Sequence, residues 1–186
     1  GNPTGDMSQA PGITGEVCVR AAHMKQRYDR LWVTERAASR DAGWHRTGDV
    51  GHFDADGRLW IEGRLVHVIV TADGPVTPVG LERRVESIPA VHRAAAVGIG
   101  PRGAQQVVIV AETESARNGL APDGLRDVVR EVLREQIGEV PAVLTASALP
   151  VDIRHNSKID RIRVGRWAQR VLGGGRDVLL DTVHEV

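Results

Sequence analysis

The chain has 186 residues, of which 41% are hydrophobic and 26% charged, and 24 lysines and arginines balance 24 aspartates and glutamates. This is the composition of a globular chain rather than a disordered one, and zero net charge provides no overall basic field for binding nucleic acid. No apolar run approaches the roughly 20 residues that cross a bilayer, and the first residues lack the basic and apolar regions of a signal peptide. We therefore expect a cytoplasmic protein with no transmembrane segment and no nucleic-acid partner.

Two local features fit this expectation. Cys18 is the single cysteine and has no partner for an internal disulfide, which is typical of a reducing compartment. Arg161, Arg163 and Arg166 form a short basic stretch near the C-terminus. In a balanced chain, such a stretch indicates the solvated face of a helix rather than a nucleic-acid site.

The first third of the chain predicts mainly strands and turns. Residues 16–20 alternate with a period of two and predict a strand, and residues 34–40 predict a short helix capped by its own threonine. Residues 43–51 form a tight polar and glycine-rich segment. A hairpin follows, whose two-residue turn is Asp56-Gly57, because this pair tolerates the positive φ that such a turn requires.

After residue 64 the pattern changes, beginning with residues 65–71, which are nearly all apolar or β-branched. The helix that begins near Asp123 has the clearest 3.6-residue period; Asp123 can cap its start and Gly138 can end it. Besides these, we expect a loop at 74–78, strands at 94–99, 106–111 and 143–148, and helices at 79–87 and 159–172.

These elements place a domain boundary near residues 64 to 66. Residues 65–186 are expected to form a compact α+β domain in which small β-sheets pack with about three helices. Residues 1–64 are expected to be the β-rich edge of a preceding, larger domain.

Three familiar patterns in the chain lack the context that their usual function needs. Residues 98–103 match G-x-G-x-x-G, but a dinucleotide site requires a helix next, whereas another strand follows, so we interpret them as a hairpin connection. Residues 54–57 resemble the start of a calcium loop, but the glycine comes two positions early and no closing glutamate follows. The seven histidines show no ligand spacing, so we expect no metal site.

Two segments carry informative chemistry. The first combines W-H-R-T-G-D (residues 44–49) with D-G-R-L-W-I-E-G-R (residues 56–64), and the second is L-P-V-D-I-R-H-N-S-K-I-D-R (residues 149–161). Taken alone, Asp49 is most often a turn residue and Lys158 a solvated lysine near a helix start. A lysine in the first helical turn is opposed by the helix dipole, and this local conflict favours a functional role.

Together and in this order, the two segments resemble the late motifs of the adenylate-forming superfamily, which includes acyl-CoA synthetases, peptide-synthetase adenylation domains and luciferases. The resemblance implies that Asp49 binds the ribose hydroxyls of ATP, that Arg64 contacts the nucleotide near a hinge, and that Lys158 is the catalytic lysine at the α-phosphate and the attacked carboxylate. It also implies ATP and Mg²⁺ as cofactors, bound mainly by a large N-terminal portion outside this chain. An ammonium placed in advance at such a developing charge typically contributes a factor of roughly 10² to 10³.

The chain also departs from the superfamily pattern. Val66 stands where the hinge acid is usual, residues 72–78 replace a Ser-Gly loop along the pantetheine path, and the segment before Lys158 is two residues longer. These features are similar to the β-lactone synthetases of bacterial long-chain olefin biosynthesis. That similarity implies adenylation of a 2-alkyl-3-hydroxy fatty acid, then attack by its own β-hydroxyl with loss of AMP. The loop at Asp73 and Gly74 would face the site in this second step.

Two other interpretations stay open at this point. One is an acyl-CoA or acyl-AMP ligase with a drifted C-terminal domain, and the other is a catalytically silent module that keeps only the fold. In each case we expect these 186 residues alone to be inactive, because they contain no phosphate-binding loop. The implied partners are ATP, a long-chain 3-hydroxy acid and other enzymes of olefin biosynthesis.

Overall fold

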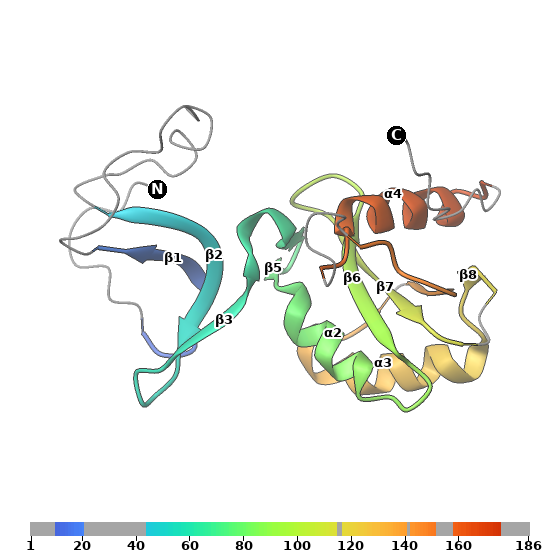
Figure 1. Ribbon diagram of the computed structural model, residues 1–186, viewed down its shortest axis with the longest axis horizontal. Coiled ribbons are helices and arrows are strands. Elements are labelled where there is room, and N and C mark those ends of the chain that lie inside the picture. The colour runs from blue at the N-terminus through green and yellow to red at the C-terminus, as the bar shows by residue number, and fades with distance from the viewer. Residues whose placement is uncertain (1–9, 21–43, 115–116, 141, 152–157, 176–186) are drawn as a thin grey trace. The chain divides into compact units, whose positions relative to one another are not determined.

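The computed structural model describes residues 10–20, 44–114, 117–140, 142–151 and 158–175. The chain divides into two compact units, Gly1–Val66 and His67–Val186, which are taken in turn below (Figure 1). The helix expected at 34–40 and the long segment immediately before Lys158 lie outside the described residues.

The first unit contains a three-stranded antiparallel sheet. Its strands are β1 (Gly15–Val19), β2 (His45–Phe53) and β3 (Leu59–Arg64), in the order β1-β2-β3. The strand expected at 16–20 is confirmed to within one residue. From His45 onward, the segment expected to be tight, polar and glycine-rich is strand, because β1 and β3 pair with its two sides and satisfy its backbone groups. Gly48, at φ +73°, accommodates the irregular backbone there.

The β2–β3 connection is a hairpin at the expected place but with a longer loop. The Asp54 N–H donates to the Arg58 carbonyl at 3.0 Å, and the Gly57 N–H donates to the Asp54 carbonyl at 3.0 Å, so the loop is 55–57. Gly57 adopts φ +77°, which is the left-handed residue that closes a three-residue hairpin loop. The expected two-residue turn was therefore wrong by one residue, although its glycine requirement was right.

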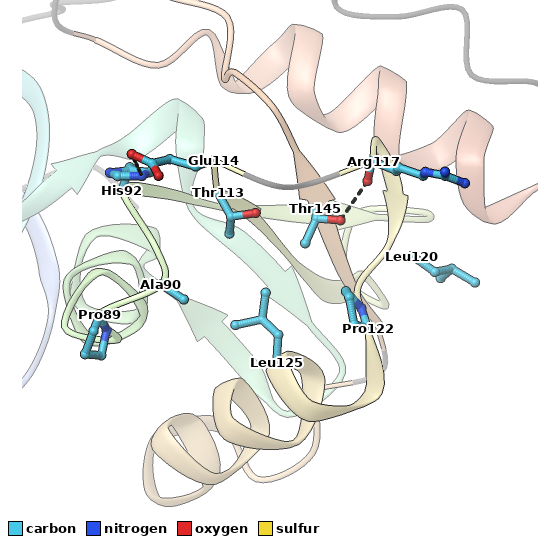
Figure 2. A pocket seen from close by; sticks show the side chains of 10 residues that line it. All are labelled: Pro89, Ala90, His92, Thr113, Glu114, Arg117, Leu120, Pro122, Leu125 and Thr145. Carbon is cyan, nitrogen blue, oxygen red and sulfur yellow. Dashed lines mark hydrogen bonds and ion pairs between the residues drawn. The ribbon is translucent and has the colours of Figure 1, made fainter.

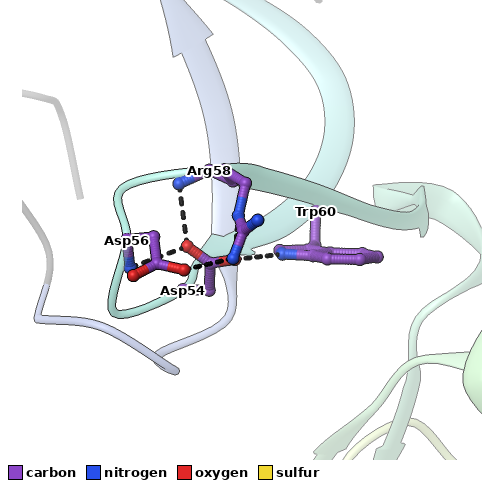
Figure 3. Close-up of polar contacts among 4 residues, drawn as sticks. All are labelled: Asp54, Asp56, Arg58 and Trp60. Carbon is purple, nitrogen blue, oxygen red and sulfur yellow. Dashed lines mark hydrogen bonds and ion pairs between the residues drawn. The ribbon is translucent and has the colours of Figure 1, made fainter.

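The carboxylate of Asp54 organises this loop (Figure 3). It accepts hydrogen bonds from the backbone N–H groups of Asp56 and Arg58 at 3.0 and 2.9 Å, and from Arg58 Nε at 2.9 Å. The indole N–H of Trp60 donates to it at 2.8 Å. The Trp60 bond, followed by the backbone bond from Arg58, lowers the pKa of Asp54 from its ordinary value of 3.8.

Residues 65–76 form short elements rather than one strand and a loop. Leu65–His67 is a 3₁₀ turn, and β4 (Ile69–Thr71) pairs with β5 (Gly74–Val76) as a small antiparallel hairpin. Thr71 stabilises the two-residue turn between them: its hydroxyl donates to the Gly74 carbonyl at 2.9 Å and accepts from the Asp73 N–H at 3.2 Å. The loop expected at 74–78 is thus partly a strand.

The second unit is built on a four-stranded mixed sheet in the order β6-β7-β9-β8. The β7–β9 pair is parallel and the other two pairs are antiparallel. The connection at 100–103 joins two antiparallel strands, which confirms it as a hairpin and not a nucleotide loop. β8 was not predicted from the sequence, because a strand of two residues is too short to show an alternating hydrophobic pattern. The elements are β6 (Arg93–Ile99), β7 (Gln106–Glu112), β8 (Gly119–Leu120), β9 (Ala142–Ala146), α2 (Pro78–Glu86), α3 (Asp123–Ile137) and α4 (Arg161–Leu172).

Helices cover both faces of this sheet, α2 and α3 on one and α4 on the other (Figure 1). Alternate residues of each strand enter opposite cores: Ala94, Ala96 and Ile109 pack with α2 and α3, whereas Val108 and Val110 pack with α4. Burial on both faces explains why these strands are nearly continuous apolar runs. The expected α+β fold is confirmed.

Two helix starts differ from the expectation. The N-cap of α3 is Pro122, without a side-chain cap, so Asp123 is the first helical residue rather than the cap; Gly138, at φ +66°, ends the helix as expected. α4 begins at Arg161, and the Asp160 carboxylate caps it by accepting the Arg163 N–H at 3.1 Å. Lys158 therefore precedes the helix, and the expected conflict between this lysine and the helix dipole does not apply.

Candidate functional site

Asp49 and Arg64 lie directly opposite each other on β2 and β3. Arg64 Nη1 is 3.2 Å from Asp49 Oδ1, and the Asp49 side chain is 32% exposed. Ion pairs with this much solvent access are weak. The carboxylate is thus held in place but can still accept hydrogen bonds from a ligand.

Thr47, two residues before Asp49 on β2, hydrogen-bonds to the Asp49 backbone. This contact was not predicted from the sequence. The Thr47 hydroxyl donates to the Val17 carbonyl of β1 at 2.9 Å and accepts from the Asp49 N–H at 3.0 Å. Gly48 between them brings its backbone close to Arg64, whose Nη2 would lie 3.6 Å from an added Cβ. The T-G-D sequence therefore fixes the backbone from which the carboxylate projects.

Val66, the expected hinge residue, is the last residue of the first compact unit. Its side chain is 77% exposed and belongs to the 3₁₀ turn that follows Arg64. A β-branched residue restricts the backbone more than an acid does.

Asp73 and Gly74 lie at the β4–β5 turn in the second unit and line a cleft of about 530 Å³. We call it the turn cleft. Among the described residues that line it, the charged side chains are those of Asp73 and Glu139, both acidic. Its other polar side chains come from Thr71, Gln105, Gln106 and Gln136.

Lys158 lies in the second unit and is exposed. Two residues separate it from Arg161, where α4 begins. The neighbouring Ile159 forms an antiparallel bridge with Val151, and the Asp160 N–H donates to the Pro150 carbonyl at 2.8 Å. These contacts tie the backbone after Lys158 to the segment that follows β9.

Arg161 does not belong to a solvated face, which corrects the sequence-based expectation. Only 18% of its side chain is exposed, and its Nε donates to Glu82 Oε1 at 3.0 Å. A second contact joins Arg161 Nη2 to Glu82 Oε2. Glu82 is on α2, 79 residues away in sequence, so no local pattern indicated the pair.

A larger hollow of about 830 Å³ lies beside β8 and the start of α3 (Figure 2). At one end of the hollow His92 faces Glu114, with His92 Nε2 3.5 Å from Glu114 Oε1. Arg117 lies at the other end. None of the residues predicted for the site lines this hollow. Within the described parts of the chain, no three His, Cys, Asp or Glu side chains are grouped to hold a metal ion, and no helix is long and apolar enough to cross a membrane.

The structure thus brings Asp49 and Arg64 into contact in the first unit, with Val66 two residues further on. Lys158 and the Asp73-Gly74 turn belong to separate loops of the second unit.

Two curated relatives are named olefin β-lactone synthetase. The one from Xanthomonas campestris pv. campestris is 40% identical over 131 residues, which cover 68% of this chain and 24% of that protein. The one from Stenotrophomonas maltophilia is 35% identical over 184 residues, which cover 91% of this chain and 33% of that protein. The chain therefore spans about a quarter to a third of the length of these relatives.

A solved structure with the same fold is that of an anthranilate CoA ligase in complex with anthranoyl-AMP. It superposes with a TM-score of 0.72 at 20% identity, over 89% of this chain and 32% of that chain. No family model matches the chain.

Proposed function

Since this chain is the C-terminal part of an enzyme of the adenylate-forming superfamily, similar to olefin β-lactone synthetases, we propose that the whole enzyme makes a β-lactone. Its substrates are ATP and a 2-alkyl-3-hydroxy fatty acid, and its products are the lactone, AMP and pyrophosphate. The observation that carries the proposal is the 35% identity to such a synthetase over 91% of the chain.

The first step is adenylation. A carboxylate oxygen of the fatty acid attacks the α-phosphorus of ATP, the bond to the β-phosphate breaks, and pyrophosphate leaves. Negative charge gathers on the non-bridging oxygens as this happens. Lys158 is proposed to place its ammonium against these oxygens, in a position fixed before the reaction begins.

The second step closes the ring. The β-hydroxyl oxygen attacks the acyl carbonyl, the bond between the carbonyl and AMP breaks, and the hydroxyl proton passes to solvent. Because nucleophile and electrophile belong to one molecule, the step avoids the entropy loss of binding a separate acceptor.

Asp49 and Arg64 are the proposed nucleotide-binding residues of this chain. The Asp49 carboxylate would accept hydrogen bonds from the ribose hydroxyls, and its exposed, weak pairing with Arg64 leaves it able to do so. Mg²⁺ enters the proposal with the phosphates of ATP, as this ion commonly binds. Its protein ligands would come from the remainder of the enzyme.

The turn cleft argues against CoA as the acceptor. In the proposal, Asp73 and Gly74 face the site during the second step, after a movement about Val66. By the family resemblance the loop at 72–78 would lie along the path of CoA, and the acidic side chains of Asp73 and Glu139 add negative charge there, which disfavours an anionic acceptor such as CoA. A lactone-forming enzyme has no need to admit this anion.

We also propose that the two compact units are the end of the nucleotide-binding domain and the small lid domain that carries Lys158. A cytoplasmic location agrees with a chain whose one cysteine has no internal partner. The enzymes that supply the hydroxy acid and consume the lactone would be its functional partners.

Product analysis of the full-length protein tests the proposal. With ATP, Mg²⁺ and a 2-alkyl-3-hydroxy acid, we expect the β-lactone and AMP in equal amounts, and no change in rate when CoA is added. Formation of the acyl-CoA at a rate comparable to lactone formation would identify an acyl-CoA ligase instead.

Lys158→Ala in the full-length protein separates an enzyme from a silent module. We expect the adenylation rate, measured by exchange of labelled pyrophosphate into ATP, to fall by roughly 10² to 10³. Arg166→Ala, at an exposed position of α4, is the matched control and should leave the rate unchanged. An unaltered rate in Lys158→Ala would remove the lysine from the mechanism.

A further inference from the structure

Glu82 is a buried acid that the proposed mechanism does not use. It lies on α2 between the core residues Leu81 and Val85, and only 6% of it is exposed. A carboxylate in such a position is costly unless it is paired and hydrogen-bonded. Its contacts therefore indicate what it is for.

The Glu82 carboxylate joins three elements of the second unit. Oε1 accepts from the Ala96 N–H of β6 at 3.0 Å and from Arg161 Nε at 3.0 Å, and Oε2 contacts Arg161 Nη2. The guanidinium thus makes a bidentate contact with the carboxylate, which fixes the orientation of the Arg161 side chain as well as its distance from Glu82. Arg161 is the first residue of α4 and the third residue after Lys158.

The backbone between Lys158 and Arg161 has little freedom. Ile159 bridges to Val151 and packs against the core beneath α4. The Asp160 N–H donates to the Pro150 carbonyl, and the Asp160 side chain caps α4. Arg161, clamped by Glu82, ties the end of this segment to the sheet.

We propose that Glu82 is a positioning residue for adenylation, which acts through Arg161 to fix the backbone of Lys158. This inference rests on the proposed function. Loss of the clamp leaves the Arg161 charge buried without its partner, so the start of α4 shifts toward solvent. Displacement of a catalytic group by about 1 Å can lower a rate by roughly a hundredfold.

Glu86 provides a matched control within the same helix. It lies one turn after Glu82, and its carboxylate accepts from the Ala94 N–H of the same strand at 3.0 Å. Within the described part of the chain, no hydrogen bond or ion pair joins Glu86 to the segment from Lys158 to Arg161. Glu86 is exposed where Glu82 is buried, and Glu86→Gln therefore removes a charge from α2 and weakens a bond to β6 without touching the lysine segment.

The test measures pyrophosphate exchange in the full-length protein for Glu82→Gln, Glu86→Gln, Lys158→Ala and the double variant Glu82→Gln/Lys158→Ala. We expect Glu82→Gln to lower kcat by roughly ten- to a hundredfold with the KM for ATP within about twofold of the wild-type value. Glu86→Gln should leave kcat unchanged. In the Lys158→Ala background, Glu82→Gln should cause no further loss, because the group that it positions is already gone.

An equal fold-loss from Glu82→Gln with and without Lys158 would overturn the inference, since it would show a general structural role. So would an unchanged kcat in Glu82→Gln. If Glu82→Gln does not fold, Arg161→Lys, which keeps the charge but not the two-pronged contact, should give the same Lys158-dependent loss; additive losses overturn the inference. Absence of exchange in the wild-type protein would instead refute the proposed function itself.

Discussion

At the scale of single residues, the pairing of Asp49 with Arg64 shows how a strand can hold a ligand-binding acid. The 3.2 Å contact spans two adjacent strands at an exposed edge of a short sheet. Such a pair contributes little stability. Arg64 can therefore orient the carboxylate without competing strongly with hydroxyl donors of a nucleotide.

We predict that Asp49→Ala in the full-length protein raises the KM for ATP by roughly tenfold or more. The reason is the loss of charged hydrogen bonds, each of which contributes about 1.5–3 kcal/mol. Steady-state kinetics of pyrophosphate release measures the change. Asp56→Asn, an exposed acid in the hairpin loop of the same sheet, should behave as wild type. A normal KM in Asp49→Ala would remove this aspartate from the nucleotide site.

Trp167 illustrates a different kind of residue, one whose side chain is buried in the core. It is 1% exposed and is the largest fully buried side chain among the described residues. We predict that Trp167→Ala lowers the free energy of unfolding by roughly 3–5 kcal/mol, because a large cavity opens beneath α4. Urea unfolding of the 186-residue chain, followed by circular dichroism, measures the loss. Ile162→Ala, at a position 62% exposed on the same helix, should change the value by less than about 0.5 kcal/mol.

At the scale of elements, the stability of the β2–β3 hairpin loop depends on the protonation state of Asp54. The depressed pKa of Asp54 means that the folded loop favours the ionised form. The resulting stabilisation is fully present above the ordinary value of 3.8 and is lost as the pH falls through the lower folded-state value. The hairpin should therefore loosen only in acid.

We predict that Trp60→Phe raises the pKa of Asp54 toward its ordinary value. The indole N–H is the largest cause of the depression, and phenylalanine keeps an aromatic ring without the donor. An NMR titration of the Asp54 carboxyl carbon in the two proteins measures the difference. Leu59→Ala, on the same strand but with no donor, is the control and should leave the titration unchanged. An identical titration in Trp60→Phe would assign the depression to the backbone donors.

Helices and strands with a clear hydrophobic pattern could be predicted from the sequence. Strands that form because neighbouring strands pair with them could not. The helix at 123–137 carries the apolar repeat that one buried face requires, and the strands buried on both faces are nearly continuous apolar runs. Residues 45–51 show neither pattern, because their strand is made by partners on both sides and their glycines suggest a turn. The 3₁₀ turn at Leu65–His67 and the two-residue β8 are too short to have any period.

The same limit applies to the site. Asp49 and Arg64 flank one hairpin, so their contact follows from local register. Glu82 and Arg161 meet only because α2 and α4 both contact β6, on opposite faces, and the sequence between them contains most of the unit. The sequence shows an acid next to Leu81 in the helix expected at 79–87, but it shows neither that this acid is buried nor which residue pairs with it.

At the scale of the whole molecule, the residues proposed for the site belong to different compact units of this chain. Asp49 and Arg64 belong to the first unit and Lys158 to the second. We predict that the 186-residue chain with millimolar ATP, Mg²⁺ and a 3-hydroxy acid releases no pyrophosphate above background, because it lacks a phosphate-binding loop. Full-length protein is the positive control in the same assay. Measurable turnover by the chain alone would contradict this prediction.

The parallel pairing of β7 with β9 also sets the order in which the second unit can be completed during synthesis. β9 lies between β7 and β8, and the chain from 113 to 141 must cross over, α3 included, before it reaches that place. Until Ala146 has left the ribosome, β7 presents an unpaired apolar edge of valine, isoleucine and alanine. Strand pairings between residues far apart in sequence form slowly. An unpaired strand edge can pair with another chain and so start aggregation. The nascent chain is therefore most prone to aggregate in the interval between the synthesis of β7 and that of β9.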